Sequence, residues 1–323
     1  MIKHFLDRNL ALEAVRVTEA AALSSSLHMG RGNEKAADQA AVNAMRNFLN
    51  NLSINGKVVI GEGERDKAPM LYIGEKVGMG GLKVDIALDP LEGTTITAHG
   101  GENALSVIAM ANKGGFLNAP DIYMNKIAYG KKYEGLEIDP ESPVDQIIYD
   151  FSKYSKMDVK NIVVCILDRP RHQNIISLVR KTGARIKLIT DGDVSAVIAT
   201  TVEDSGVDIY LGSGGSPEGV LAAAALRCLG GKIYGKLLFQ TDTEKQRASD
   251  MGINDFNKIY TTNDLASGEV MFAATGVTDG TLLKGVRIKN NIATTHSVVM
   301  RSKTQTVRYV QASHNLYIKP IVS

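Results

Sequence analysis

The sequence predicts an α/β protein in which an N-terminal domain with a mixed sheet packs on a C-terminal domain with a mostly parallel sheet. Three observations support this class. Short β runs alternate with short helices between positions 161 and 229, which is typical of βαβ units. The first half instead combines amphipathic helices with strands that stop at glycine or proline turns. The 323 residues, 44% hydrophobic and 22% charged, are enough to bury a core and exclude wholesale disorder.

Two helices are expected near the N-terminus, over residues 10–23 and 34–52. The clearest stripe of the second helix begins with a carboxylate and continues with apolar residues. Its members are Asp38, Val42, Met45 and Leu49. Inward-facing carboxylates are rarely left unpaired, so Asp38 taken alone favours a buried salt bridge over a ligand role.

Short strands are expected next, at 57–60 and 83–88. The first stops at Gly61-Glu62-Gly63-Glu64. The second stops at Asp89-Pro90, because proline cannot donate to a sheet ladder and biases the residue before it to an extended conformation. Further strands are expected at 104–111 and 122–128.

The second half carries the alternating pattern. Its expected elements are a helix at 143–154, a strand at 161–167, a helix at 172–181, a strand at 185–189, a helix at 193–201, a strand at 207–211 and a helix at 216–229. Residues 297–301 and 306–310 are expected to form a hairpin. No linker composition marks a boundary, and we expect two packed domains, residues 1–157 and 158–323.

Composition excludes several classes of protein. A formal net charge of +2 without a basic run argues against nucleic-acid binding. The two cysteines, Cys165 and Cys228, lie in apolar runs and are expected to be reduced and buried. The first fifteen residues lack the apolar region of a signal peptide, and no stretch is apolar enough to span a membrane. A cytoplasmic location without membrane contact is therefore expected.

The segment Asp89-Pro90-Leu91-Glu92-Gly93-Thr94 carries the densest chemistry. It places two carboxylates, a backbone carbonyl and a hydroxyl just past an apolar strand. Mg²⁺ and similar hard cations prefer such oxygens. The alternative is an Asx-type turn with a solvated Glu92, and the segment alone does not decide between the two.

Two further acids lie at comparable places. Glu62 follows a strand and lies between glycines, which suggests a tight backbone bend that presents it. Glu218 lies in the first turn of the helix expected from Ser216, where its charge also suits the helix dipole. A glycine-rich loop that leads into a helix, as in GSGGSPEG, is a natural anion cradle. The run also suggests dinucleotide binding, but it lacks the GxGxxG spacing, and the chain has no P-loop and no HExxH.

These acids and their contexts resemble the lithium-sensitive sugar phosphatase superfamily, which includes inositol monophosphatases, and above all its class II (GlpX-type) fructose-1,6-bisphosphatase family. The likeness covers nearly the whole chain. Its motifs, in order, are TEAAAL, GRGNEKAAD, AAVNAM, VIGEGE, APMLYIGEKVG, DPLEGT, NAPDIYM, RPRH, DGDV, GGSPEG, FAATGVTDG and NIATT. The resemblance implies alternating layers of helix and sheet, and metal-dependent release of the 1-phosphate of fructose 1,6-bisphosphate.

The resemblance also implies roles for individual residues. The implied metal ligands are Asp38, Glu62, Asp89, Glu92 and Glu218. Thr94 and Asp38 are the implied catalytic pair. The implied substrate contacts are Glu92, Gly93, Thr94, Tyr123, Arg169, Pro170, Arg171, Asp191, Gly192, Asp193 and Gly215, with Lys35 as a further phosphate contact. The implied cofactor is Mn²⁺ or Mg²⁺, two or more ions per site, and the implied assembly is a homodimer or homotetramer. Glutamate at both 92 and 218 argues against an inositol phosphatase.

The charge requirements of the reaction suggest a mechanism. A phosphate dianion repels nucleophiles, and divalent ions offset that charge. We expect Thr94 and Asp38 to position and deprotonate the attacking water, with a direct Thr94 nucleophile less favoured. The backbone N–H groups of Gly93 and Thr94 would hold phosphate oxygens. Arg169 and Arg171 suit the distal 6-phosphate, and either aspartate of the DGD segment would accept sugar hydroxyls.

Three alternatives remain open. Sedoheptulose-1,7-bisphosphatase activity would use the same two-phosphate pocket. The segment KLITDGDVS weakly resembles the start of a haloacid-dehalogenase-type phosphatase, with Asp191 as nucleophile and Asp193 as acid. A sugar-phosphate sensor would bind without turnover, although a sensor needs neither Thr94 nor all five acids.

Overall fold

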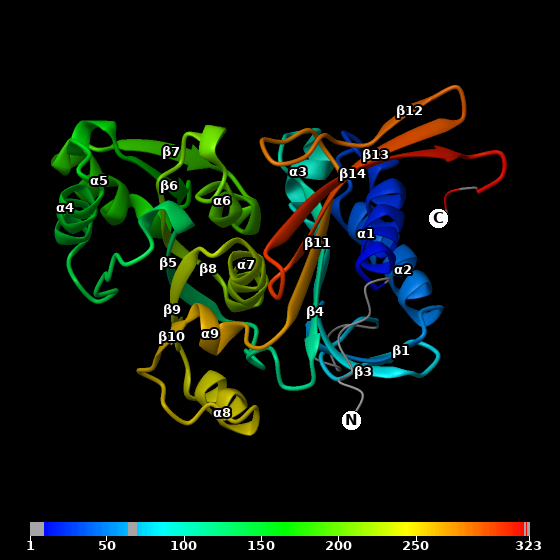
Figure 1. The fold of residues 1–323 in the computed structure, drawn as a ribbon, viewed down its shortest axis with the longest axis horizontal. Coiled ribbons are helices and arrows are strands. Elements are labelled where there is room, and N and C mark those ends of the chain that lie inside the picture. Colours follow the sequence, from blue (N-terminus) through cyan, green and yellow to red (C-terminus); the bar gives the residue numbers. More distant parts are fainter. Residues whose placement is uncertain (1–9, 64–69, 320, 322–323) are drawn as a thin grey trace. The chain divides into compact units, whose positions relative to one another are not determined.

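The computed structural model describes residues 10–63, 70–319 and 321. The chain divides into two compact units (Figure 1), one discontinuous and one formed by residues 119–265. The first unit comprises residues 1–118 and 266–323. The boundary expected between residues 157 and 158 therefore lies inside the second unit. The reason is a long-range strand pairing, because the chain returns at residue 266 to complete the first sheet, and no local pattern announces that return.

One mixed sheet organises the described part of the first unit, in the order β12-β13-β11-β4-β3-β1-β2, with β14 paired to β13. Its strands are β1 (Ile54–Ile60), β2 (Lys76–Val77), β3 (Leu82–Glu92), β4 (Leu105–Asn112), β11 (Val270–Gly276), β12 (Arg287–Lys289), β13 (Ile292–Arg301) and β14 (Thr306–Asn315). The pairing of β1 with β3 is parallel, and the other pairings are antiparallel. The hairpin predicted near the C-terminus is confirmed as β13 and β14, each longer than expected.

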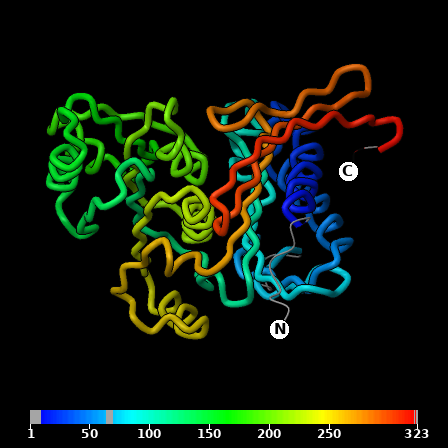
Figure 2. Tube along the Cα trace, in the orientation of Figure 1, coloured from blue at the N-terminus to red at the C-terminus, as the bar shows by residue number. Residues whose placement is uncertain are grey.

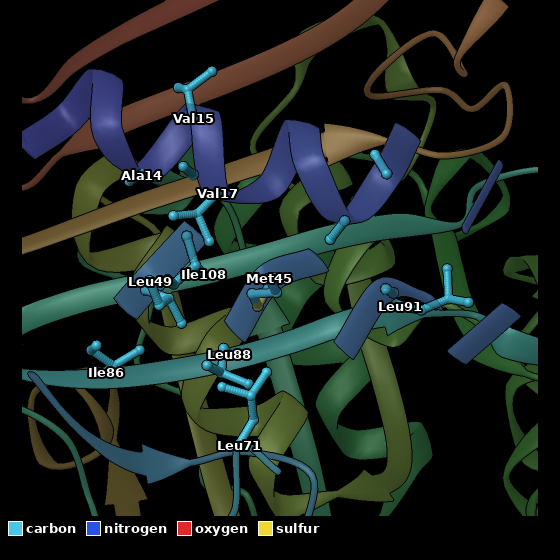
Figure 3. Close-up of a cluster of buried hydrophobic side chains, with 14 of the residues drawn as sticks. Ala14, Val15, Val17, Met45, Leu49, Leu71, Ile86, Leu88, Leu91 and Ile108 are labelled. Atoms are coloured by element: carbon cyan, nitrogen blue, oxygen red, sulfur yellow. The ribbon is translucent and has the colours of Figure 1, made fainter. Parts of the chain in front are cut away.

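Helices α1 (Leu10–Ser26) and α2 (Glu34–Asn50) pack against this sheet, and the short α3 (Thr94–His99) follows β3. Figure 3 shows the buried cluster that joins them, in which Met45 and Leu49 of α2 lie close to Leu88 of β3. Hydrophobic burial of this kind is the main favourable term in folding. The apolar part of the predicted α2 stripe is thereby confirmed, since Val42, Met45 and Leu49 are all buried.

The second unit is built on a six-stranded sheet in the order β10-β9-β5-β8-β6-β7. Its strands are β5 (Tyr123–Tyr129), β6 (Val163–Leu167), β7 (Arg185–Ile189), β8 (Ile209–Gly215), β9 (Lys232–Leu238) and β10 (Ile259–Thr261). Only β8-β6-β7 pair in parallel, and the remaining pairings are antiparallel. The α/β class is confirmed, but the expectation of a mostly parallel sheet is wrong, because β5 and β9 add an antiparallel half.

Helices cover both faces of the second sheet. They are η1 (Lys131–Tyr133), α4 (Val144–Ser155), η2 (Val159–Asn161), η3 (Pro170–His172), α5 (Gln173–Thr182), α6 (Asp193–Ala199), η4 (Glu203–Ser205), α7 (Ser216–Leu229), α8 (Asp242–Asp250) and α9 (Thr262–Leu265). Figure 2 shows α4 and α5 on one face and α6 and α7 on the other. Residues of β5 alternate between these faces, so Ile127 joins the α4–α5 core while Met124 points towards α7.

Two strands end later than the sequence predicts. Strand β3 does not stop at Asp89-Pro90 but continues to Glu92, because the register against β4 shifts between Asp89 and Glu92. Such a bulge needs no ladder donor at the proline. Strand β8 does not stop at residue 211 but continues to Gly215. Cys165 and Cys228 are free and buried, as expected, and no helix in the described part of the chain is long and apolar enough to cross a membrane.

Candidate functional site

In the first unit, the carboxyl ends of β1 and β3 carry two of the predicted ligands. The strands are parallel, and Ile60 pairs with Ala87. Two residues further on, Glu62 follows β1 and Asp89 lies near the end of β3, so the register brings both to the same edge of the sheet. The parallel pairing is what turns two acids 27 positions apart into neighbours along one edge.

Asp89 forms the Asx-type turn that the sequence left open. Its Oδ1 accepts a hydrogen bond from the Leu91 N–H at 3.0 Å. The solvated glutamate of that alternative is wrong, because Glu92 is 4% exposed. The bulge between the two residues accounts for both facts, since it bends the strand and re-aims the side chains that follow.

Gly93 links β3 to α3 in a left-handed conformation, with φ of +92°. This conformation is costly for residues with a Cβ. The Gly93 carbonyl accepts the Thr97 N–H at 2.9 Å and so starts the helix. Thr94 is the first residue of α3 and is half-buried. The glycine therefore sets the direction in which the predicted catalytic hydroxyl is presented.

The amino end of α2 is tied to α3 through the loop before it. Gly30 donates to the Thr97 carbonyl at 2.9 Å, and Gly32 donates to the Ala98 carbonyl at 2.8 Å. Asp38 lies just past the first turn of α2 and is half-buried, and burial raises the pKa of its carboxyl. No ion pair involving Asp38 is present among the described residues, which goes against the salt-bridge interpretation. Lys35, one turn earlier, is exposed.

Glu62 lies in a tightly folded corner. Its N–H donates to the Leu71 carbonyl at 3.1 Å. A Cβ at Gly61 would lie 2.1 Å from that same carbonyl oxygen, so only glycine fits there. The bend predicted from the flanking glycines is thus observed at Gly61, while Glu64 of the same motif lies outside the described residues.

The acids of this edge suit a hard cation by their chemistry, because every donor is a carboxylate oxygen. Their placement is looser than a formed metal site. Within residues 10–63, 70–319 and 321, no group of three or more His, Cys, Asp or Glu side chains is close enough to hold an ion. Four of the five predicted ligands belong to the first unit, and Glu218 belongs to the second.

In the second unit, the predicted substrate contacts gather at the carboxyl ends of three parallel strands. Arg169-Pro170-Arg171 follows β6, Asp191-Gly192-Asp193 follows β7, and Gly215 ends β8. Tyr123 begins the antiparallel β5 and pairs with Gly215. Ligands of open α/β sheets bind at this end of the strands, so the topology agrees with the predicted role.

The two arginines of this edge are held differently. Arg171 donates from Nη2 to the Ser213 carbonyl at 2.9 Å, and its guanidinium lies 4.7 Å from the centre of the Tyr123 ring. Tyr123 itself is 42% exposed. Arg169 lies 3.8 Å from Asp191, a looser ion pair. Both guanidinium groups keep donors available for an anion.

His172 holds the Arg171 segment in place, and the sequence analysis missed it. Its Nε2 accepts the Ser213 N–H at 2.8 Å, so Nδ1 carries the proton and donates to the Leu167 carbonyl at 2.7 Å. Burial is the main cause that lowers the pKa of His172. The signal in the sequence was a histidine in RPRH, between a strand and the helix that follows it.

A buried ion pair between Lys126 and Asp193 was also missed. Lys126 is 2% exposed, and its Nζ also donates to the Gly215 carbonyl at 2.9 Å. Glu218 lies nearby, and its Oε2 is buried with no hydrogen-bond partner in the described part of the chain. Burial and the Asp193 charge raise the pKa of Glu218 to about 7, against an opposing effect of Lys126. The available signal was a lysine on the inward-facing side of an apolar strand.

The glycine run before α7 is closely approached by side chains. A Cβ at Gly214 would lie 2.3 Å from Asp193 Oδ2, and one at Gly215 would lie 2.0 Å from Glu218 Oε2. Both glycines belong to β8 and not to a loop. They make room for two carboxylates that approach the strand backbone.

Comparison with known proteins shows which family the chain resembles. Residues 8–314 match the family described as bacterial fructose-1,6-bisphosphatase, glpX-encoded. The chain is 46% identical over 326 aligned positions to the fructose-1,6-bisphosphatase 1 class 2 of Escherichia coli K12, with 96% of each chain covered. It has the same identity and coverage with the fructose-1,6-bisphosphatase class 2 of Shigella flexneri.

Proposed function

The chain belongs to the bacterial, glpX-encoded fructose-1,6-bisphosphatase family, and we propose that it releases the 1-phosphate of fructose 1,6-bisphosphate through a carboxylate-held divalent-metal site. The products are fructose 6-phosphate and phosphate, and the reaction serves gluconeogenesis. The family match confirms the resemblance found in the motifs. The structural observation that carries the proposal is the edge of the second unit, where two arginines, a tyrosine and the DGD segment converge.

Binding of the 6-phosphate is assigned to Arg169 and Arg171. Guanidinium groups bind phosphate oxygens in a bidentate manner, and Ser213 orients Arg171 through its carbonyl. The Tyr123 ring packs against one face of the Arg171 guanidinium, while the N–H donors that would bind phosphate lie at the edge of that group. Asp191 and Asp193 are acceptors for the sugar hydroxyls, because carboxylates accept but do not donate when ionised.

Metal ions, Mn²⁺ or Mg²⁺ and two or more per site, are assigned to Asp38, Glu62, Asp89, Glu92 and Glu218. The all-oxygen donor set supports this assignment, because hard divalent cations prefer carboxylate oxygens. When bound, such ions offset the phosphate charge, acidify water and stabilise the leaving alkoxide.

The chain's own groups at the 1-phosphate are Thr94 and Asp38. Thr94 is presented by the left-handed Gly93, and its hydroxyl would orient the attacking water. Asp38, half-buried just past the first turn of α2, would accept the proton. The N–H groups of Gly93 and Thr94 would hold phosphate oxygens, and Lys35 on the exposed first turn of α2 would add a positive charge.

The haloacid-dehalogenase alternative is disfavoured by one contact. It requires Asp193 as a proton donor, but Asp193 Oδ2 instead accepts from Lys126 Nζ in a buried ion pair. Sedoheptulose-1,7-bisphosphatase activity, alone or as a second activity, stays within the proposal because the same arginines would bind its distal phosphate.

The first experiment measures phosphate release from fructose 1,6-bisphosphate by metal-stripped protein with Mn²⁺, Mg²⁺ or neither. We expect metal-dependent release, lost in Thr94→Ala and weak on inositol monophosphate. A folded protein that is silent with every ion contradicts the proposal. A panel of sugar phosphates then separates another substrate from binding without turnover, and sedoheptulose 1,7-bisphosphate tests the dual activity.

The metal role of Asp89 needs a variant that keeps its turn. Asp89→Ala is expected to abolish turnover, but it also removes the acceptor for the Leu91 N–H. Asp89→Asn keeps an oxygen at that position and removes only the charge. We expect both variants to fall below a tenth of wild-type activity with the fold intact. Activity above a tenth in Asp89→Asn would remove Asp89 from the metal site.

Location and assembly complete the proposal. A cytoplasmic location is supported by the free, buried Cys165 and Cys228, which suit a reducing compartment. A homodimer or homotetramer rests on the family resemblance, and light scattering of the purified protein tests it. Partners other than the sugar bisphosphate are not part of the proposal.

A further inference from the structure

Among the lysines and arginines described in the second unit, Lys126 is the most deeply buried. None of the roles proposed above for binding or catalysis involves it. Its side chain is 2% exposed, on the sheet face that packs against α7. A buried ammonium loses its hydration, and this loss destabilises the fold unless the group is paired and hydrogen-bonded. An apolar residue of the same length would avoid this loss. The lysine at this position therefore indicates a role for its charge.

The stem of Lys126 is held between the sheet and α7. A Cβ at Gly219 would lie 3.5 Å from Lys126 Cδ and 2.7 Å from Met124 Sδ, so the helix approaches β5 closely because residue 219 is glycine. The stem thus has little freedom to move. Its ammonium lies at the carboxyl end of β8, where the Gly215 carbonyl accepts it at 2.9 Å.

The ammonium then pairs with one particular carboxylate. Asp193 Oδ2 accepts from Lys126 Nζ, and Asp193 is 7% exposed at the first position of α6. Gly214 leaves the room for this contact, because a Cβ there would clash with both partners. The ammonium from β5, the start of α6 and the space at Gly214 together fix the position of the Asp193 carboxylate.

We propose that Lys126 is a positioning residue for substrate binding, which fixes the Asp193 carboxylate so that its remaining lone pairs accept the hydroxyl groups of a sugar phosphate. This inference rests on the proposed function, since it assumes that Asp193 contacts the sugar. Lys126 itself does not touch the substrate. Its contribution is preorganisation, because an acceptor already held in place loses less freedom on binding.

A double-mutant cycle on product binding tests the inference. The probe is fructose 6-phosphate, titrated by calorimetry into the full-length, Mn²⁺-loaded protein, so that the readout does not depend on turnover. Lys126→Met keeps the length of the stem and removes the charge. We expect it to raise the Kd by about tenfold in the wild-type background and by less than about threefold in the Asp193→Asn background. Activity assays should show the same loss in KM, with kcat changed less.

The control variant is Lys132→Met. Lys132 pairs with Asp208 at 3.0 Å, at the opposite end of β8. The Lys132→Met variant removes a lysine of the same unit from an ion pair that has no role in the proposal. We expect its Kd for fructose 6-phosphate to equal that of the wild type. Should Lys126→Met fail to fold, Lys126→Gln keeps a donor for Asp193, and the same cycle with it is expected to show a smaller loss that again disappears in Asp193→Asn.

The outcomes separate this inference from the proposed function. Equal losses in both backgrounds, or no loss in the wild-type background, overturn the role of Lys126 while wild-type hydrolysis still stands. A wild-type protein that neither binds fructose 6-phosphate nor hydrolyses fructose 1,6-bisphosphate overturns both. A loss confined to the Asp193 background supports the inference, because a purely structural lysine would weaken binding whatever residue 193 is.

Discussion

The two ends of strand β8 carry a lysine–aspartate pair each, and the pairs have different surroundings. At the amino end, Asp208 accepts the Tyr133 hydroxyl at 2.7 Å, the Val163 N–H at 3.0 Å and Lys132 at 3.0 Å. At the carboxyl end, Lys126 and Asp193 pair deep in the unit, but Glu218 Oε2 has no hydrogen-bond partner among the described residues. The polar groups at the first, closed end are satisfied within the protein, whereas the proposed function assigns those at the second, open end to a ligand.

On the proposed function, this difference assigns stability to one end of the sheet and ligand binding to the other. Buried polar groups are normally satisfied within the protein, and a group that is not satisfied costs stability. The amino end follows that rule and contributes to folding. The carboxyl end tolerates an unsatisfied carboxylate and an exposed tyrosine, which is expected where a ligand completes the contacts. Variants at the two ends should therefore affect different measurements.

The largest expected effect is on stability, at the closed end. Asp208→Ala removes the acceptor of a buried tyrosine hydroxyl and of a backbone N–H, and we expect the free energy of unfolding to fall by about 3 kcal/mol. Chemical denaturation measures this loss. Lys132→Met, which removes only the half-exposed partner, should cost no more than about 1 kcal/mol. A changed KM in folded Asp208→Ala would mean that the two ends are not separate.

The next effect is on substrate affinity, at the open end. Arg171→Ala should raise KM about tenfold with kcat changed less than about twofold, because the phosphate charge it meets is the same in the ground and transition states. Its guanidinium is already oriented by Ser213 and Tyr123, so little reorganisation accompanies binding. Steady-state kinetics provide the measurement. An unchanged KM removes Arg171 from the substrate site.

The sequence predicted elements best where the pattern is local. The strand at 185–189 and the helix at 216–229 match the structure residue for residue, because local periodicity decides them, with a proline in the first turn of the helix and the left-handed Gly230 after its last residue. The bulge at Asp89 and the strand through Gly214 and Gly215 were missed. Both depend on what approaches from elsewhere in the fold, namely β4 in one case and two carboxylates in the other.

The candidate site shows the same limit. Motifs named Asp193 and Glu218, but they did not name Lys126, whose importance follows from the burial of β5 against α7. Motifs likewise placed Arg171 but not His172, which holds the Ser213 backbone beside it. Residues that touch a ligand are visible in a sequence by their type and spacing. Residues that position them are visible only once the sheet register and helix packing are known.

The smallest effect is the acid sensitivity of the closed end. Burial acts to raise the pKa of Asp208, but the hydrogen bonds from Tyr133, Val163 and Lys132 outweigh it and leave the pKa below its usual range. A carboxyl whose folded pKa is depressed stabilises the fold above its unfolded pKa, about 3.9, and this contribution is lost as the pH falls through the folded value. Wild type should therefore be more stable than Asp208→Asn by a constant amount from about pH 5 to about pH 8. This difference in the free energy of unfolding should shrink below about pH 4. Denaturation curves across that range measure it. A difference that persists undiminished at the acid end would show that the hydrogen bonds of the Asp208 side chain, and not its charge, stabilise this end of the sheet.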